Sequence, residues 1–155
     1  MQLTRFTDIG LRVVMRLAVQ GDGSMTTRAL ADDLEVPYTH VAKVVGRLSE
    51  LGIVHSRRGR TGGLVITELG RTARVGWLAG RLEGEGEVVD CDGLTPCPLR
   101  IACRLRGALA AARRAFFASL DEQTVGDLVA DPTGAVLLTL DLPRRNVAEV
   151  DRVAE

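Results

Sequence analysis

Residues 26–67, TTRALADDLEVPYTHVAKVVGRLSELGIVHSRRGRTGGLVIT, decide the fold of this chain. Two threonines open a helix that is expected to run through Leu34, because their hydroxyl groups can accept hydrogen bonds from the first free backbone N–H groups. Val36-Pro37 then makes a tight turn. The proline begins another helix, expected over residues 38–51, where its missing N–H costs nothing. Two short helices around such a turn are the layout of a helix-turn-helix.

The second of these helices has one apolar face and one polar face. Its apolar residues recur at helical spacing and are expected to be buried, namely Val41, Val44, Val45 and Leu48. The opposite face carries Thr39, His40, Lys43 and Arg47. Gly52 follows, in the position where a glycine commonly ends a helix. The helix therefore offers a basic outer face of the kind that enters the major groove of DNA.

A β-hairpin is expected directly after this helix. The stretch from Ile53 to Thr67 contains two apolar segments around a tip with three arginines and three glycines. Glycine lets the backbone turn sharply, and arginine can contact phosphate or enter a narrow minor groove. The pattern predicts a "wing" beside the helix-turn-helix, after which Thr67 can cap the next helical segment.

Together these elements predict a DNA-binding surface. A helical hairpin with surface arginines is, on its own, commonly just a solvated face, but a helix, a turn, a basic helix and an Arg/Gly wing in this order are hard to explain without DNA. Residues 1–82 carry 12 Lys or Arg against 7 Asp or Glu, whereas residues 83–155 carry 8 against 13, which places the basic charge on the same half. The residues expected to contact DNA are Thr27, Arg28, Tyr38, Thr39, His40, Lys43, Arg47, Arg57, Arg58 and Arg60.

Length and composition fit a DNA-binding protein of this kind. A chain of 155 residues suffices for one domain, or for a small domain with a dimerisation element. We expect a mainly α fold with a small β-wing, made of a winged helix-turn-helix domain plus a long dimerisation helix. Neither a membrane-spanning run nor a signal layout is found in the sequence, so a cytoplasmic location is expected. The sequence offers no nucleophile–base pair and no phosphate-binding glycine loop, so we expect no enzyme.

The three cysteines of the chain are evenly spaced as C-x5-C-x5-C, at Cys91, Cys97 and Cys103. An odd number of thiols within so short a run does not suit a disulfide scaffold. Thiolates are the soft ligands that iron–sulfur clusters and zinc select, so the spacing predicts a metal centre. Zinc held by three cysteines and a carboxylate, or bare thiols that sense oxidants, are the alternatives. Both are colourless, whereas an iron–sulfur protein is brown.

The cysteines are not expected on one continuous helix. In that case Cys97 and Cys103 would lie about 120° apart around the helix and ~9 Å apart along it. We therefore expect Cys91 and Cys97 on a loop and Cys103 at the first turn of the following helix. The free N–H groups of a helix N-terminus would stabilise negative charge on its sulfur.

That helix is expected from Ile101 to Leu120. Its apolar stripe consists of Ile101, Leu105, Ala108, Leu109, Ala112, Phe116 and Leu120. A helix with few partners in its own chain is expected to pack on its copy in a second subunit, and the alternative is packing on its own winged helix. Paired half-sites on DNA favour the homodimer. The expected organisation is a winged-helix domain over 1–83, a cysteine loop over 84–103, a dimerisation helix and a following short helix over 101–130, and a partly disordered tail over 131–155.

The first helix, expected over residues 4–20, has its own core stripe and one acidic residue off that stripe. The stripe consists of Phe6, Ile9, Val13 and Leu17. Asp8 lies about 200° around the helix from Phe6, so it should point away from the core. An acid in the first turn is favoured by the helix dipole, which by itself is enough to explain Asp8.

Three features together resemble the Rrf-type winged-helix regulators: the N-terminal run LTRFTD (residues 3–8), the winged helix, and C-x5-C-x5-C before a long helix. The resemblance covers about residues 1–130. It implies a homodimeric transcription factor that holds an iron–sulfur cluster through its three cysteines. The branch that regulates cluster biogenesis has a histidine three residues after the last cysteine and holds a 2Fe–2S cluster. Here that position is Arg106, and the two histidines, His40 and His55, lie in the expected DNA-facing helix and wing.

The chain is more similar to the nitric-oxide-sensing branch of the family in its actinobacterial form. That resemblance implies a 4Fe–4S cluster whose fourth ligand is a carboxylate from the first helix of the opposite subunit, and Asp8 occupies the matching position. It further implies a repressor that releases operator DNA when nitric oxide reacts with the cluster. A 2Fe–2S redox sensor of the same family is the alternative. An oxygen ligand on iron is more labile than a thiolate, so that iron would be the entry point for nitric oxide.

Overall fold

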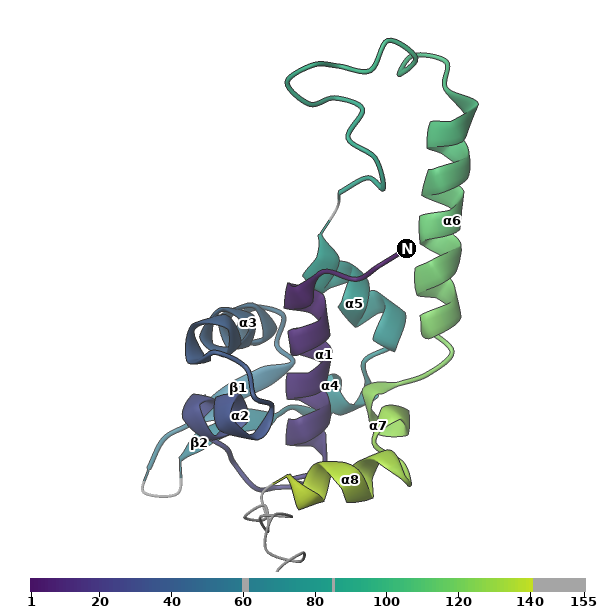
Figure 1. Cartoon of the computed structure of the whole chain (residues 1–155). Coiled ribbons are helices and arrows are strands. Elements are labelled where there is room, and N and C mark those ends of the chain that lie inside the picture. Colours follow the sequence, from purple (N-terminus) through teal and green to yellow (C-terminus); the bar gives the residue numbers. More distant parts are fainter. Residues whose placement is uncertain (60–61, 85, 141–155) are drawn as a thin grey trace, which may run out of the picture.

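A computed structural model of the protein describes residues 1–59, 62–84 and 86–140. Helices dominate it, and the named strands form one two-stranded antiparallel sheet. In Figure 1, helix α1 (Arg5–Ala18) stands at the centre, the long helix α6 stands at one side, and the loop that carries the cysteines arches above them. The mainly α fold with a small β-wing that the sequence predicts is confirmed.

Helix α1 supplies the central part of the core. Its N-cap is Thr4, whose hydroxyl accepts a hydrogen bond from the backbone N–H of Thr7 at 3.3 Å. Its inward face is fully buried, with Ile9, Val13, Val14 and Leu17 each no more than 3% exposed. Phe6, which the sequence placed in the same stripe, is only partly buried against this core. Fully burying an aliphatic side chain such as Val13 or Leu17 stabilises the folded state by about 1.5–3 kcal/mol.

Helices α2 (Thr27–Asp33) and α3 (Tyr38–Glu50) form the helix-turn-helix. Thr26 caps α2 by accepting a hydrogen bond from the backbone N–H of Ala29 at 3.0 Å. The turn between the helices uses the left-handed conformation of Glu35, with φ at 53°. The four residues of α3 predicted to face inward are indeed buried, namely Val41, Val44, Val45 and Leu48.

The wing is the hairpin of β1 (Val54–Arg57) and β2 (Gly63–Ile66), in which Val54 pairs with Ile66 and Arg57 with Gly63. Gly63 allows a close approach, since a Cβ on this residue would lie 2.9 Å from the carbonyl oxygen of Met25. Met25 and Leu64 exchange backbone hydrogen bonds of 3.1 and 2.7 Å. The segment before α2 is thereby attached to the wing, so the helix-turn-helix and the wing keep a fixed relation.

Two helices, α4 (Glu68–Thr72) and α5 (Val75–Glu83), follow the wing. Helix α6 (Arg104–Leu120) packs on α5 through Gly76, where any Cβ would overlap the carbonyl oxygen of Phe117. Part of α6 therefore packs on its own winged-helix domain, which was the alternative to the expected dimer contact.

Helix α6 begins three residues later than the sequence predicted. The residues before it form hydrogen-bonded turns, with the N–H of Arg100 bonded to the carbonyl of Cys97 at 3.2 Å and that of Ala102 to the carbonyl of Leu99 at 3.1 Å. Cys103 then adopts an extended conformation as the N-cap. These turns place Ile101 outside the helix, 90% exposed.

The C-terminal part returns to the core. Helix α7 (Val125–Leu128) contributes Val125, which is fully buried in the same core as α1. Helix α8 (Thr133–Thr139) falls in the tail that the sequence predicted to be partly disordered, and residues 141–155 of that tail lie outside the described residues. No helix within the described ranges combines the length and apolarity needed to cross a membrane.

Candidate metal centre and nucleic-acid interface

The structure places two of the cysteines on a loop and the third at the start of a helix. Cys91 is buried, Cys97 and Cys103 are half-buried, and all three thiols are free. The backbone N–H of Cys97 donates to the carbonyl oxygen of Cys91 at 3.0 Å, which closes the loop between them. Cys103 is the N-cap of α6, where free N–H groups favour negative charge on a sulfur.

The other two cysteines and the neighbouring charged residues act on the thiol of Cys91. Burial raises the pKa of the Cys91 thiol, Arg106 lowers it, and Cys97, Glu87 and Cys103 each raise it. Neighbouring thiolates that repel one another are stabilised when they bind a positively charged metal group. In the part of the chain that the structure describes, no set of three His, Cys, Asp or Glu side chains converges on a single ion. What the structure offers a metal group is three free cysteine thiols, the soft donors that iron–sulfur clusters and zinc both take.

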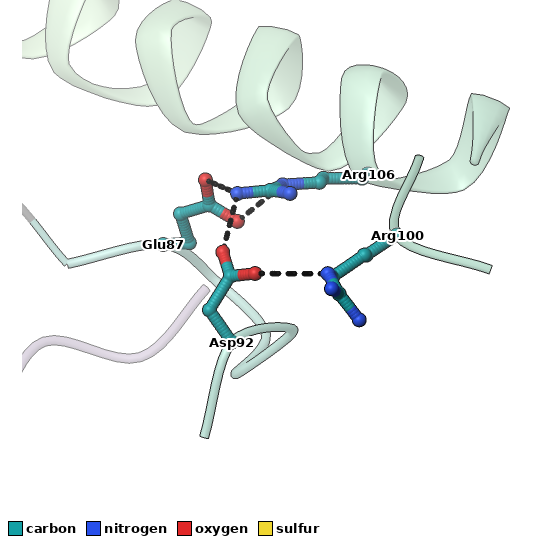
Figure 2. A network of polar contacts seen from close by, with 4 residues as sticks. All are labelled: Glu87, Asp92, Arg100 and Arg106. Atoms are coloured by element: carbon teal, nitrogen blue, oxygen red, sulfur yellow. Dashed lines mark hydrogen bonds and ion pairs between the residues drawn. The ribbon is translucent and has the colours of Figure 1, made fainter. Parts of the chain in front are cut away.

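An ion-pair network clamps the cysteine loop to α6 (Figure 2). Arg106 donates from Nε to Glu87 at 2.8 Å and from Nη2 to the same carboxylate at 2.6 Å. Nη2 also donates to Asp92 at 3.0 Å, and Nε of Arg100 lies 3.7 Å from the other oxygen of Asp92. The hydrogen bond and charge of Glu87 raise the pKa of Arg106 above its ordinary value. Glu87 precedes Cys91 in the sequence and Asp92 follows it. The ion pairs of the clamp therefore hold the chain on both sides of this cysteine.

Within the described residues, no hydrogen bond joins Asp8 to the cysteine loop of its own chain. Its carboxylate pairs with Arg12 one turn further along α1, at 2.8 Å, and its side chain is 45% exposed. As the sequence predicted, Asp8 points away from the core stripe. A half-exposed carboxylate on the first turn is accessible to a second chain.

The predicted DNA-contact residues of the helix-turn-helix share one outer surface. The guanidinium carbon of Arg28 lies 4.4 Å from the ring centre of Tyr38, which joins the start of α2 to the start of α3. Thr39, His40 and Lys43 are exposed. Thr27 and Arg47 are less accessible than these residues. Thr27 is half-buried, and Arg47 forms an ion pair with Glu50 at 3.0 Å.

The wing carries the remaining candidates. Arg57 and Arg58 are exposed at its tip. Arg57 donates from Nη1 to the carbonyl oxygen of Asp22 at 3.4 Å, which joins it to the segment between α1 and α2. Arg60 lies outside the described residues.

Sequence reasoning missed two charged residues near the candidate metal centre. Arg106 was noticed only as a departure from histidine, and its role in the clamp was not foreseen. Glu83 was not considered, although its carboxylate accepts hydrogen bonds from Thr4 and Thr7 at the start of α1. One signal was available, because an acid at the C-terminal end of a helix is opposed by the helix dipole and so points to a specific partner.

A winged helix-turn-helix with an exposed basic helix defines the class of DNA-binding regulators, and here it is joined to a loop of free cysteines. Residues 3–131 match the Rrf2 family, described as iron-dependent transcriptional regulators, and the chain belongs to that family.

Individual relatives agree with this assignment. The chain is 61% identical over 142 residues to the HTH-type transcriptional repressor NsrR of Streptomyces coelicolor, covering 90% of this chain and 96% of that protein. It is 34% identical over 132 residues to the HTH-type transcriptional regulator NsrR of Shouchella clausii, covering 83% and 89%. The solved structure of T. potens IscR has the same fold, with a TM-score of 0.68 at 19% identity over 87% of this chain and 90% of that one. The chain is thus a DNA-binding transcriptional regulator of the Rrf2 type.

Proposed function

We propose that this protein is a homodimeric transcriptional repressor that senses nitric oxide through a 4Fe–4S cluster and releases its operator when the cluster is nitrosylated. The observation that carries the proposal is the loop of three free cysteines, closed by the Cys97–Cys91 hydrogen bond and clamped by Arg106. The similarity to a repressor from Streptomyces coelicolor supports repression as the output.

The proposed ligands are Cys91, Cys97 and Cys103 of one subunit and Asp8 of the partner subunit. The residue that follows the last cysteine by three, Arg106, has no lone pair to offer a metal and already binds Glu87. A carboxylate from outside the loop is therefore the better fourth ligand, and Asp8 is half-exposed on the first turn of α1. When bound, a 4Fe–4S cluster supplies iron that reacts with nitric oxide.

Helix α1 is the element that would carry the signal to DNA. It packs against α3, and Arg16 of α1 pairs with Asp33 of α2 at 2.9 Å, so its position sets the position of the helix-turn-helix. While Asp8 is held by the partner subunit, α1 is held too, and the two α3 helices keep the spacing of a near-palindromic operator. Release of Asp8 would free α1. A coupling of ~1.4 kcal/mol already changes operator affinity tenfold.

The expected complex has α3 in the major groove and the wing on the flanking minor groove. The residues proposed to contact DNA are Thr27, Arg28, Tyr38, Thr39, His40, Lys43, Arg47, Arg57, Arg58 and Arg60. Their surface position on α2, α3 and the wing supports this role for all but Arg60, which lies outside the described residues.

The proposal is tested by titrating anaerobically purified protein with nitric oxide while visible absorbance and binding to its own promoter DNA are followed together. We expect a brown chromophore to bleach as DNA is released. In Asp8→Asn, bleaching and DNA release should no longer coincide, whereas Glu122→Gln, a change at an exposed acid after α6, should behave as the unchanged protein does.

The same titration separates the other candidates. A brown protein whose DNA binding ignores nitric oxide would point to a different signal, such as redox sensing by a 2Fe–2S cluster. A protein that is colourless even when prepared without oxygen would point to zinc or to bare thiols, since three free cysteines also suit those chemistries.

A further inference from the structure

Three consecutive residues at the end of α5, which we name the junction (residues 82–84), together contact two other helices, α1 and α6. Leu82 packs so tightly on α1 that a Cβ at Gly10 would lie 2.6 Å from its Cδ1 atom. Glu83 binds the first turn of α1. The carbonyl oxygen of Gly84 accepts a hydrogen bond from Nη2 of Arg113 on α6 at 2.6 Å. The junction therefore attaches α1 to α6, the helix whose N-cap is Cys103.

Glu83 is the centre of the junction. Both of its carboxylate oxygens accept a hydrogen bond from the backbone N–H of Thr4 at 3.1 Å, and one also accepts from the Thr4 hydroxyl at 3.0 Å. The hydroxyl of Thr7, a fully buried side chain, donates to the same oxygen. Hydrogen bonds to an ionised acceptor are about twice as strong as neutral ones, and a carboxylate at a helix N-terminus is favoured by the dipole.

The turn that Glu83 holds is the turn that presents Asp8. The backbone N–H of Asp8 donates to the carbonyl oxygen of Thr4 at 3.0 Å, so Thr4 and Asp8 belong to one hydrogen-bonded turn. A shift of Thr4 therefore shifts Asp8. In Figure 1 this end of α1, the end of α5 and the start of the cysteine loop lie at the same side of the molecule.

We propose that Glu83 is a positioning residue for Asp8, and that through it the junction couples the two cluster sites of the dimer. This inference rests on the proposed function, in which Asp8 of each chain serves the site of the other chain. The junction connects Asp8 to the cysteine-bearing elements of its own chain. Filling one site thus orders the α1 helix that the second site needs, and emptying one site loosens it.

The first test counts clusters per dimer by native mass spectrometry during stepwise anaerobic loading. At half loading, independent sites leave about half of the dimers with one cluster, whereas a tenfold coupling leaves about one quarter. At half loading we expect about one quarter of the dimers to carry a single cluster in the unchanged protein, and about one half in Glu83→Gln. Glu68→Gln, a change at an exposed acid in α4, is the matched control and should stay at about one quarter.

The second test needs no cluster. In the metal-free protein, hydrogen exchange of the amides of residues 4–8 should be at least tenfold faster in Glu83→Gln and unchanged in Glu68→Gln. Unchanged exchange in Glu83→Gln overturns the positioning role. If the unchanged protein binds iron but about half of its dimers carry one cluster at half loading, the sites are independent. This result overturns the coupling, leaves the proposed function intact, and does not require the variant to fold. A protein that binds no iron overturns both.

Discussion

Replacing Asp33 by alanine should destabilise the protein strongly, because it removes the carboxylate that pairs with the buried positive charge of Arg16. Arg16 is fully buried, and the Asp33 side chain is only 12% exposed. Nε and Nη2 of Arg16 both lie 2.9 Å from the same carboxylate oxygen. This pair is a polar link between α1, which carries Asp8, and α2 of the helix-turn-helix.

The burial of the pair sets the magnitude. Removing one partner of a buried ion pair costs about 3–5 kcal/mol, because the remaining charge stays desolvated. For a chain of this size, a loss of 1 kcal/mol lowers the midpoint of thermal unfolding by about 2–4 °C. We therefore expect Asp33→Ala to lower the midpoint by about 6–20 °C, whereas Asp32→Ala, at the exposed neighbouring position, should change it by no more than about 2 °C.

A double replacement separates stability from signalling. Arg16→Met with Asp33→Leu removes both charges and keeps similar volumes, so unfolding by heat should be close to that of the unchanged protein. If the pair transmits the movement of α1, this variant should still bind operator DNA but respond less to nitric oxide. A drop of less than about 3 °C for Asp33→Ala would refute the argument from burial, and a full response of the double variant would refute the role in transmission.

Other predictions concern the cysteines, the clamp, the wing and a helix cap. Replacing any one of the three cysteines by alanine should abolish stable iron binding, measured as iron per chain, and full iron content would remove that residue from the ligand set. Arg106→Lys keeps the charge but loses the two-pronged geometry, so hydrogen exchange of residues 86–92 should rise and iron should be lost faster to a chelator, whereas Arg114→Lys, at an exposed position on α6, should change neither. Arg58→Ala should weaken binding to all DNA sequences and reduce the slope of log affinity against log salt by about one; an unchanged slope would exclude a phosphate contact. Hydrogen bonds from the backbone and hydroxyl of Thr124 lower the pKa of Asp127, so the stability that this cap gives is present at neutral pH and is lost as the pH falls through the pKa of the folded protein. Thermal unfolding between pH 7 and pH 3 should therefore show a smaller acid-induced decrease in Asp127→Asn than in the unchanged protein.

The helix-turn-helix and the wing could be predicted because their signals are local. Thr26 caps α2, and the valines of α3 are buried, as periodicity and cap chemistry indicate. Gly52, with φ at 72°, ends α3 as expected. Each of these features depends on residues within a few positions of one another, and such signals can be read directly from a sequence.

The surroundings of the cysteines could be predicted only in part. Spacing was enough to place Cys103 at the start of a helix, but the clamp joins Arg106 to Glu87, 19 residues away, and Glu83 reaches Thr4 across 79 residues. Helix periodicity contains no information about such partners. The start of α6 was also predicted too early, because the apolar Ile101 continues the helical pattern while the backbone still forms turns.

Helix α1 combines three roles that the sequence does not show together. Its first turn is held by Glu83, its outer face presents Asp8, and its last turns bind α2 through Arg16. A rigid helix that is packed against neighbours at both ends transmits a displacement of one end to the other, because packed cores do not deform smoothly. The arrangement supports a device in which one carboxylate on α1 is enough to report the state of a metal group to the DNA-reading helices. In the proposed mechanism the strength of that report would depend on Glu83 and the Arg16–Asp33 pair, and neither of these lies among the proposed metal ligands or DNA contacts.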